Sequence, residues 1–280
     1  MNRSRKGIRR LLTGAFGVVL LCGAPFTQGQ IVPLVDKNSS AQINAGTSSG
    51  MFNWTVDGVN QLVQQWFWFR VGAVGGESPI NALGPASILT PNARTAYITY
   101  ANAAVSVEVD YLLTGFAVGS RNSDISETIR ISNRTAAPLD FHFFQYSDFD
   151  LAGTPGSDTV QLGQDIYGKY NEAAVTKVGS SVSETVVSPG ANHGEAAIFN
   201  STLVKLNDAN PTTLNDNVGP VGPGDATWAF EWDFTIAPGA SLGISKDKYL
   251  HWNPVPEPST VALLVGGLIA ARLYRRRSLV

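Results

Sequence analysis

The stretch from Trp228 to Ala237 alternates between large apolar and polar side chains. Its apolar set is Trp228, Phe230, Trp232, Phe234 and Ile236, and its polar set includes Glu231, Asp233 and Thr235. A period of two places these sets on opposite faces of a β-strand. The stretch therefore predicts a strand with one face on a core. The same alternation appears at Val105–Leu113, Thr95–Tyr100, Thr128–Ile131 and Leu139–Tyr146.

Turn signals separate these stretches. Asp57-Gly58 predicts a two-residue hairpin, because a type I′ turn needs positive φ at both central residues. The segment from Val59 to Phe67 also fits helical spacing, but the hairpin signal and the dense aromatics favour a strand. No long helix is predicted in the body. Many short antiparallel strands with one polar face predict an all-β, sandwich-like single domain over residues 30–253.

The charge distribution separates the two ends from the body. Nine of the 20 basic residues lie near the termini, which leaves 11 basic against 21 acidic residues in 30–256, a formal charge of −10. Binding of nucleic acid rests on a basic footprint that this body lacks, so nucleic acid is excluded as an expected partner. The single cysteine, Cys22, lies in the N-terminal apolar run, so the body must be held together by burial without a disulfide.

Residues 1–29 are predicted to be a secretory signal peptide. A basic segment at 1–10 precedes an uncharged apolar run at 11–24, which is the n-region and h-region layout of such signals. We expect cleavage after Gly29, which leaves Gln30 as the new terminus, because Pro25 disfavours a cut after Ala24. A lipoprotein reading through Cys22 is disfavoured by the bulky Leu21 before it.

Residues 254–280 have the layout of a membrane-sorting tail. A Pro-rich stem with Pro256, Glu257 and Pro258 is followed by an apolar segment and by the basic residues Arg272, Arg275, Arg276 and Arg277. A helix over 261–274 would rise about 21 Å, which is less than the roughly 30 Å of a bilayer core and indicates a marginal transmembrane anchor. Basic residues at both ends favour two cytoplasmic termini, with the body on the far side of the inner membrane.

This tail resembles the PEP-CTERM sorting signal of exopolysaccharide-producing Gram-negative bacteria. In that family exosortase, a membrane-embedded protease-like enzyme, recognises the tail, removes it and delivers the protein outward. The resemblance implies that Pro256, Glu257 and Pro258 form the recognition tripeptide and that Arg275–Arg277 form the basic terminus. An ordinary tail anchor is the alternative. The body also resembles uncharacterised ectodomains of the family through segments 52–59, 66–68 and 143–148, a resemblance that implies no activity.

Sequence patterns for catalysis in the body are weak. Gly46–Gly50 matches G-x-S-x-G, but a nucleophile elbow needs a strand before Ser48 and a helix after it, whereas a polar stretch precedes it and a hairpin follows. The three histidines, His142, His193 and His251, show no zinc-binding spacing, so no zinc cofactor is expected. We expect His142 to be a packed or surface residue of an aromatic strand.

Two clusters are candidates for binding. Asp148, Asp150 and Asp158 lie near Gly153 and Gly156 and offer oxygen ligands for calcium, although a solvated acidic loop is the alternative. On a strand over 62–71, one face would carry Gln64, Trp66, Trp68 and Arg70, a platform on which a sugar ring could stack. The alternative for this second group is a central strand buried on both faces.

Two functions fit these patterns. The first is a non-enzymatic surface or extracellular-matrix protein that is sorted by exosortase and associated with exopolysaccharide. The alternative is a secreted carbohydrate-binding module, or a carbohydrate-active enzyme that uses two of its many carboxylates. For the enzyme, a pair of carboxylates must face each other across a cleft.

Overall fold

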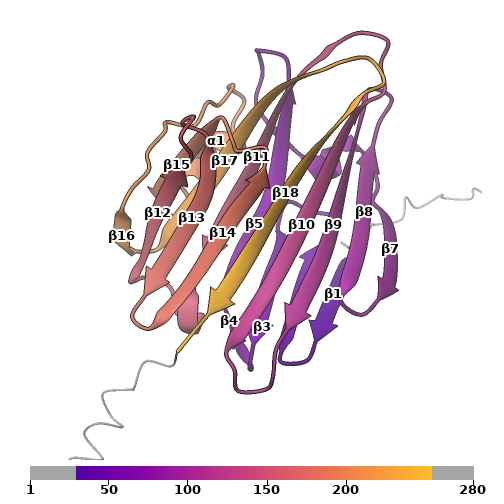
Figure 1. The fold of residues 1–280 in the computed structure, drawn as a ribbon. Coiled ribbons are helices and arrows are strands. Elements are labelled where there is room, and N and C mark those ends of the chain that lie inside the picture. Colours follow the sequence, from indigo (N-terminus) through magenta and orange to yellow (C-terminus); the bar gives the residue numbers. More distant parts are fainter. Residues whose placement is uncertain (1–29, 254–280) are drawn as a thin grey trace, which may run out of the picture.

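The computed structural model describes residues 30–253, and they form an all-β, sandwich-like fold. Two mainly antiparallel sheets of nine strands each lie face to face (Figure 1). The predicted signal peptide at 1–29 and sorting tail at 254–280 lie outside the described residues. No helix among the described residues has the length and apolar character needed to cross a membrane.

Sheet A carries most of the aromatic residues. Its strands run in the order β1 (Ile31–Asp36), β2 (Ser39–Asn44), β3 (Gly50–Val56), β5 (Leu62–Val71), β11 (Leu139–Phe149), β17 (Ala226–Ile236) and β15 (His193–Ile198). The short strands β4 (Val59–Asn60) and β6 (Ser78–Pro79) pair with β3 and β5.

Sheet B covers the other side of the core. Its strands run in the order β16 (Val221–Gly224), β12 (Asp158–Gln164), β13 (Tyr170–Lys177), β14 (Ser180–Ser188), β18 (Ser241–His251), β10 (Asn122–Asn133), β9 (Val105–Gly115), β8 (Thr95–Ala101) and β7 (Ser87–Asn92).

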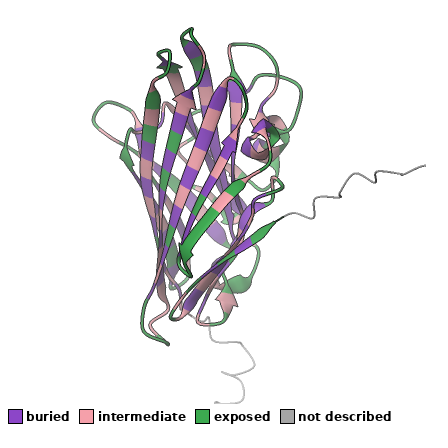
Figure 2. Ribbon diagram, turned by 90° about the vertical axis from the view of Figure 1, so that its right-hand side faces the viewer, coloured by how far each residue is buried: buried purple, intermediate pink, exposed green. Residues whose placement is uncertain are grey.

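The strands predicted from alternation are all present. Trp228–Ala237 corresponds to β17, Val105–Leu113 lies in β9, and the three shorter stretches lie in β8, β10 and β11. In β9, Val105, Val107, Val109, Tyr111 and Leu113 are all buried. Figure 2 shows the same alternation of buried and less buried residues along the strands.

The predicted hairpin is also present. β3 and β4 pair antiparallel around Asp57 and Gly58, and both central residues have positive φ, 48° and 82°. The ambiguous segment after the hairpin is a strand, because Leu62–Val71 forms β5 in the middle of sheet A.

The core between the sheets is dense in aromatic rings. Phe143 of β11 stacks on Phe67 of β5 with ring centroids 5.4 Å apart, and Phe149 stacks on Trp228 of β17 at 5.3 Å. Such pairs add to the free energy gained by burying their apolar area.

Four charged side chains are buried in this core. Glu127 of β10 pairs in register with Lys246 of β18, and Glu184 of β14 pairs in register with Lys248 of the same strand. Each of the four is at most 1% exposed. Lys246 bonds Glu127 and lies 3.3 Å from Glu184 Oε1, while Lys248 Nζ lies 3.0 Å from Glu127 Oε2.

Sheet A reaches across the core to these charges. Gln145 Nε2 donates to both carboxylate oxygens of Glu184, at 2.9 and 2.7 Å, and Trp228 Nε1 donates to Glu184 Oε2 at 3.1 Å. Gln65 Nε2 donates to Glu127 Oε2 at 3.2 Å. Burial alone would raise the pKa of Glu127, but the charges and hydrogen bonds of the two lysines outweigh it and lower the pKa to about 2. The two sheets therefore share one compact ionic network.

Two irregular segments pack against sheet A, and the first of them also contacts β8 and β9 of sheet B. One contains η1 (Ile80–Leu83), and the other follows β15 and contains α1 (Ser201–Leu206) and the chain up to β16. Trp68 Nε1 of β5 donates to Asn207 Oδ1 at 3.2 Å and Trp66 Nε1 donates to Asn81 Oδ1 at 3.1 Å, so both covers are tied to the sheet. We call residues 207–218 the covering segment.

Candidate functional site

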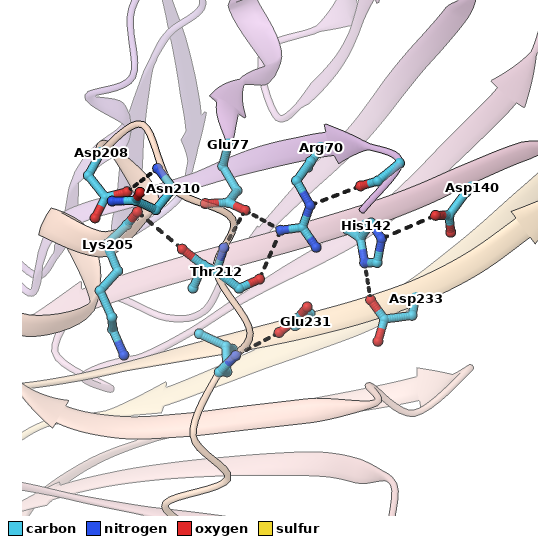
Figure 3. Close-up of polar contacts among 12 residues, drawn as sticks. Arg70, Glu77, Asp140, His142, Lys205, Asp208, Asn210, Thr212, Glu231 and Asp233 are labelled. Atoms are coloured by element: carbon cyan, nitrogen blue, oxygen red, sulfur yellow. Dashed lines mark hydrogen bonds and ion pairs between the residues drawn. The ribbon is translucent and has the colours of Figure 1, made fainter. Parts of the chain in front are cut away.

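The strand register of sheet A brings polar residues together on its outer face. His142 of β11 lies opposite Arg70 of β5 on one side and opposite Asp233 of β17 on the other. His193 of β15 lies opposite Glu231 of β17. Residues directly opposite each other in neighbouring strands have side chains on the same face and within contact range. We call these five residues the outer-face cluster, most of which is drawn in Figure 3.

The two histidines of the cluster share carboxylate partners. His142 Nδ1 lies 2.5 Å from Asp233 Oδ1, and His142 Nε2 lies 3.7 Å from Asp140 Oδ2. His193 Nδ1 lies 3.0 Å from Asp216 Oδ2, and His193 Nε2 lies 3.7 Å from Asp233 Oδ2. Asp233 therefore binds His142, Asp216 binds His193, and Asp233 lies near both imidazoles.

Glu231 is the deepest carboxyl of the cluster. It is 1% exposed, and its Oε2 accepts a hydrogen bond from the backbone N–H of Leu214 at 2.8 Å. Burial raises the pKa of Glu231 to about 7, with Asp233 adding to the rise and with the Leu214 N–H, His193 and Arg70 opposing it. At neutral pH this carboxyl can therefore both give and accept a proton.

Arg70 binds groups of the protein itself through Nε and Nη1. Its guanidinium pairs with Glu77, and its Nη1 donates to the carbonyl oxygen of Thr212 at 2.9 Å (Figure 3). The N–H of Thr212 donates to Glu77 Oε1 at 2.9 Å, and Arg70 Nε donates to the carbonyl oxygen of Gly72 at 3.0 Å. The covering segment therefore occupies the positions from which a ligand would contact Arg70.

The cluster also contains a set of potential metal ligands. One ligand atom from each of His142, Glu231 and Asp233 lies within 4.8 Å of the others. A histidine with two carboxylates is a donor set that suits several first-row metals. In this structure His142 Nδ1 binds Asp233 and Glu231 Oε2 binds the covering segment, whereas His142 Nε2 is buried without a hydrogen-bond partner.

The predicted tryptophan platform has the expected face but not an open surface. Gln64, Trp66, Trp68 and Arg70 lie on one face of β5, as alternation requires, and the ring of Trp66 also packs against Tyr100 of β8 in sheet B. Trp66 is 1% exposed and Trp68 is 0% exposed beneath the covering chain. Gln64 Nε2 donates to the carbonyl oxygen of Ser48 at 2.7 Å. The two indoles therefore pack inside the domain and offer no accessible face to a sugar in this structure.

Two of the predicted calcium ligands converge, and a residue that sequence patterns missed joins them. Ligand atoms of Asp148, Asp150 and Asp225 lie within 4.8 Å of one another. Asp158, the third predicted ligand, begins β12 nearby. The sequence did not indicate Asp225 as a ligand, because it lies 75 positions after Asp150. It reaches the group only through the pairing of β11 with β17, where Asp148 lies opposite Thr227.

The G-x-S-x-G string lies in the turn between two strands. Ser48 follows β2 and precedes β3, with no helix after it. The strand-to-helix turn that a nucleophile elbow requires is therefore not found around Ser48. His251, at the end of β18, bonds the side chain of Asn122 at 2.6 Å and lies apart from the outer-face cluster.

Comparisons with known proteins identify the tail and the fold. Residues 254–278 match the PEP-CTERM protein-sorting motif. No match is found among curated protein sequences. Among solved structures, a bacterial glucoamylase bound to acarbose is similar over 85% of this chain and 36% of its own, with 7% identity and a TM-score of 0.53.

Two further solved structures are similar over most of their own length. A galactose mutarotase-like protein from Lactobacillus casei has 9% identity, a TM-score of 0.48 and coverage of 79% of this chain and 100% of its own. A GalM/aldose epimerase homologue from C. elegans has 9% identity, a TM-score of 0.48 and coverage of 80% and 99%. At such identities the glucoamylase likeness shows the fold alone, and this chain spans about a third of that enzyme.

The chain is thus a β-sandwich ectodomain joined to a sorting signal. The signal is the PEP-CTERM motif, which implies export, processing by exosortase and a C-terminal membrane anchor before cleavage. The predicted recognition residues Pro256, Glu257 and Pro258 lie within the matched range.

Proposed function

We propose that this protein is a non-enzymatic component of the cell surface or extracellular matrix, exported through its signal peptide and released by exosortase. The match of residues 254–278 to the sorting motif supports the export route. The body is acidic and has no basic footprint, so polysaccharide is a better-suited neighbour for it than nucleic acid. Exopolysaccharide is the proposed neighbour of the mature domain.

One observation carries the non-enzymatic part of the proposal. Two buried polar groups of the outer-face cluster bind the protein's own covering segment. Arg70 binds Thr212, and Glu231 binds Leu214. A catalytic site has to leave such groups free for a substrate. The arrangement is that of a covered sheet, in which the segment is held by specific polar contacts.

The export part of the proposal is tested by the intact mass of the exported protein. The matched variant is Glu257→Ala, which alters the central residue of the tripeptide and leaves the ectodomain sequence unchanged. The exported wild-type chain is expected to lack residues 261–280, whereas the variant is expected to keep them.

The second candidate is a carbohydrate-active enzyme, and the outer-face cluster favours it. Glu231, whose pKa is raised to about 7, lies beside Asp233, which holds His142 through a 2.5 Å contact. Two carboxyls in different environments are the usual acid and base of glycoside chemistry. This candidate requires the covering segment to move away from Glu231.

An activity assay separates the two candidates. The exported protein is incubated with a panel of soluble polysaccharides, including the exopolysaccharide of the producing cells, and new reducing ends are measured. We expect none above the background. An activity that Glu231→Gln abolishes, and that Glu172→Gln at an exposed position of sheet B leaves intact, would replace our proposal with the enzyme.

A further inference from the structure

At one end of the sandwich, four aspartates from three segments meet where the chain crosses from sheet A to sheet B. Asp148 is near the end of β11, Asp150 follows that strand directly, Asp158 opens β12, and Asp225 lies between β16 and β17. The connecting loop turns sharply through residues with positive φ, among them Ala152 at 59° and Ser157 at 65°. We call these four residues the aspartate cluster. It is separate from the outer-face cluster.

The spacing of three of these carboxylates suits one bound ion. Ligand atoms of Asp148, Asp150 and Asp225 lie within 4.8 Å of one another. Oxygens that bind the same calcium ion at about 2.3–2.6 Å can be at most about 5 Å apart. All three aspartates therefore already meet the distance condition for a shared cation.

Buried oxygens without partners point to a missing ligand. Asp148 is 2% exposed, and its Oδ1 accepts no hydrogen bond. Asp158 is 0% exposed, and neither of its carboxylate oxygens accepts one. A buried carboxylate without a partner destabilises the folded state, so native proteins pair such groups or place a metal on them.

The protein supplies little positive charge to this cluster. Lys177 Nζ lies 3.8 Å from Asp158 Oδ2, and the same ammonium donates to the carbonyl oxygens of Thr154 and Gly156, at 2.6 and 2.7 Å. Lys177 is thus shared with the loop. Four carboxylates against one lysine leave a formal charge of about −3 when all are ionised. Burial raises the pKa of Asp148 to about 8, and the negative charges of Asp225, Asp150 and Asp158 add to the rise.

We propose that the aspartate cluster is a calcium site that ties the crossing between the two sheets together. Asp148, Asp150 and Asp225 are the first ligands, and Asp158 completes the anionic shell. Calcium fits better than magnesium, because it accepts six to eight oxygens in irregular geometry, whereas magnesium requires a near-ideal octahedron. Ligands from β11, β12 and the start of β17 would join both sheets through one ion.

The test uses the exported protein freed of metal with EDTA and then titrated with calcium chloride. We expect calcium to raise the thermal midpoint, and binding measured by calorimetry to weaken about tenfold or more in Asp148→Asn and Asp225→Asn. Asp165→Asn, in the turn between β12 and β13, is the control and should bind like the wild type.

A further measurement keeps a folding defect apart from a loss of ligands. In EDTA, Asp148→Asn should be at least as stable as the wild type, because it removes a buried charge without a partner. The proposal is overturned if calcium leaves the thermal midpoint of the wild type unchanged, if Asp148→Asn and Asp225→Asn respond as strongly as the wild type, or if magnesium gives the same shift at the same concentration.

Discussion

Glu127→Ala is expected to lower the free energy of unfolding by about 3–5 kcal/mol, because it leaves two buried lysines without their closest counter-ion. Glu127 is the nearest carboxylate to both Lys246 and Lys248, and all three side chains are inaccessible to water. Urea unfolding of the exported protein at pH 7 measures the effect. Glu172→Ala, an exposed glutamate of the same sheet, should change the free energy of unfolding by less than about 0.5 kcal/mol.

Two further measurements follow from the same network. The double variant Glu127→Met and Lys246→Met should recover most of the lost stability, since apolar residues of similar volume replace a buried ion pair at little cost. The folded-state pKa of Glu127, about 2, lies below its ordinary 4.5, so its contribution is complete above pH 4.5 and is lost as the pH falls toward 2. A Glu127→Ala protein as stable as the wild type at pH 7 would contradict this account of the core.

Trp66→Ala is expected to lower the free energy of unfolding by about 3–5 kcal/mol, the usual cost of emptying a buried aromatic site. The ring of Trp66 packs edge-on against Tyr100 at 6.0 Å, and its Nε1 holds Asn81 in the cover of sheet A. A Cβ at Gly50 would collide with the ring, so the backbone of β3 also lies against it. Urea unfolding is again the measurement.

The control for this variant is Tyr167→Ala, an aromatic that is 81% exposed, which should leave the stability nearly unchanged. If Trp66→Ala instead abolished binding to a glycan while changing the stability by less than about 1 kcal/mol, Trp66 would belong to an accessible sugar platform after all.

Periodicity predicted the strands well because each depends on local chemistry. The aromatic set of β17 had to face a core, and Asp57-Gly58 is the usual dipeptide for a turn with two positive φ angles. These signals act within a few residues and need no knowledge of which strands are neighbours.

The polar clusters could not be predicted from local patterns. β18 places Ile244, Lys246, Lys248 and Leu250 on one face, so its alternation mixes charged and apolar side chains and does not indicate which face is buried. The face with the two lysines is buried because Glu127 and Glu184 on the neighbouring strands pair with them. The outer-face cluster likewise depends on the register of four strands.

The aspartate cluster was predictable in part. Asp148, Asp150 and Asp158 are close in sequence, and their residue type suggested an oxygen site. Asp225 required the pairing between β11 and β17, which no local signal encodes. The covering segment has no period at all, so the burial of the predicted tryptophan platform became apparent only in the fold.

We propose the removal of both ends, which leaves the β-sandwich as the mature protein. The most direct test of this claim is the intact mass of the protein recovered outside the producing cells. We predict a chain that begins at Gln30 and lacks residues 261–280, whereas Glu257→Ala should remain with the membrane and keep its tail. An exported wild-type chain that still ends at Val280 would contradict the claim and make the tail a permanent anchor.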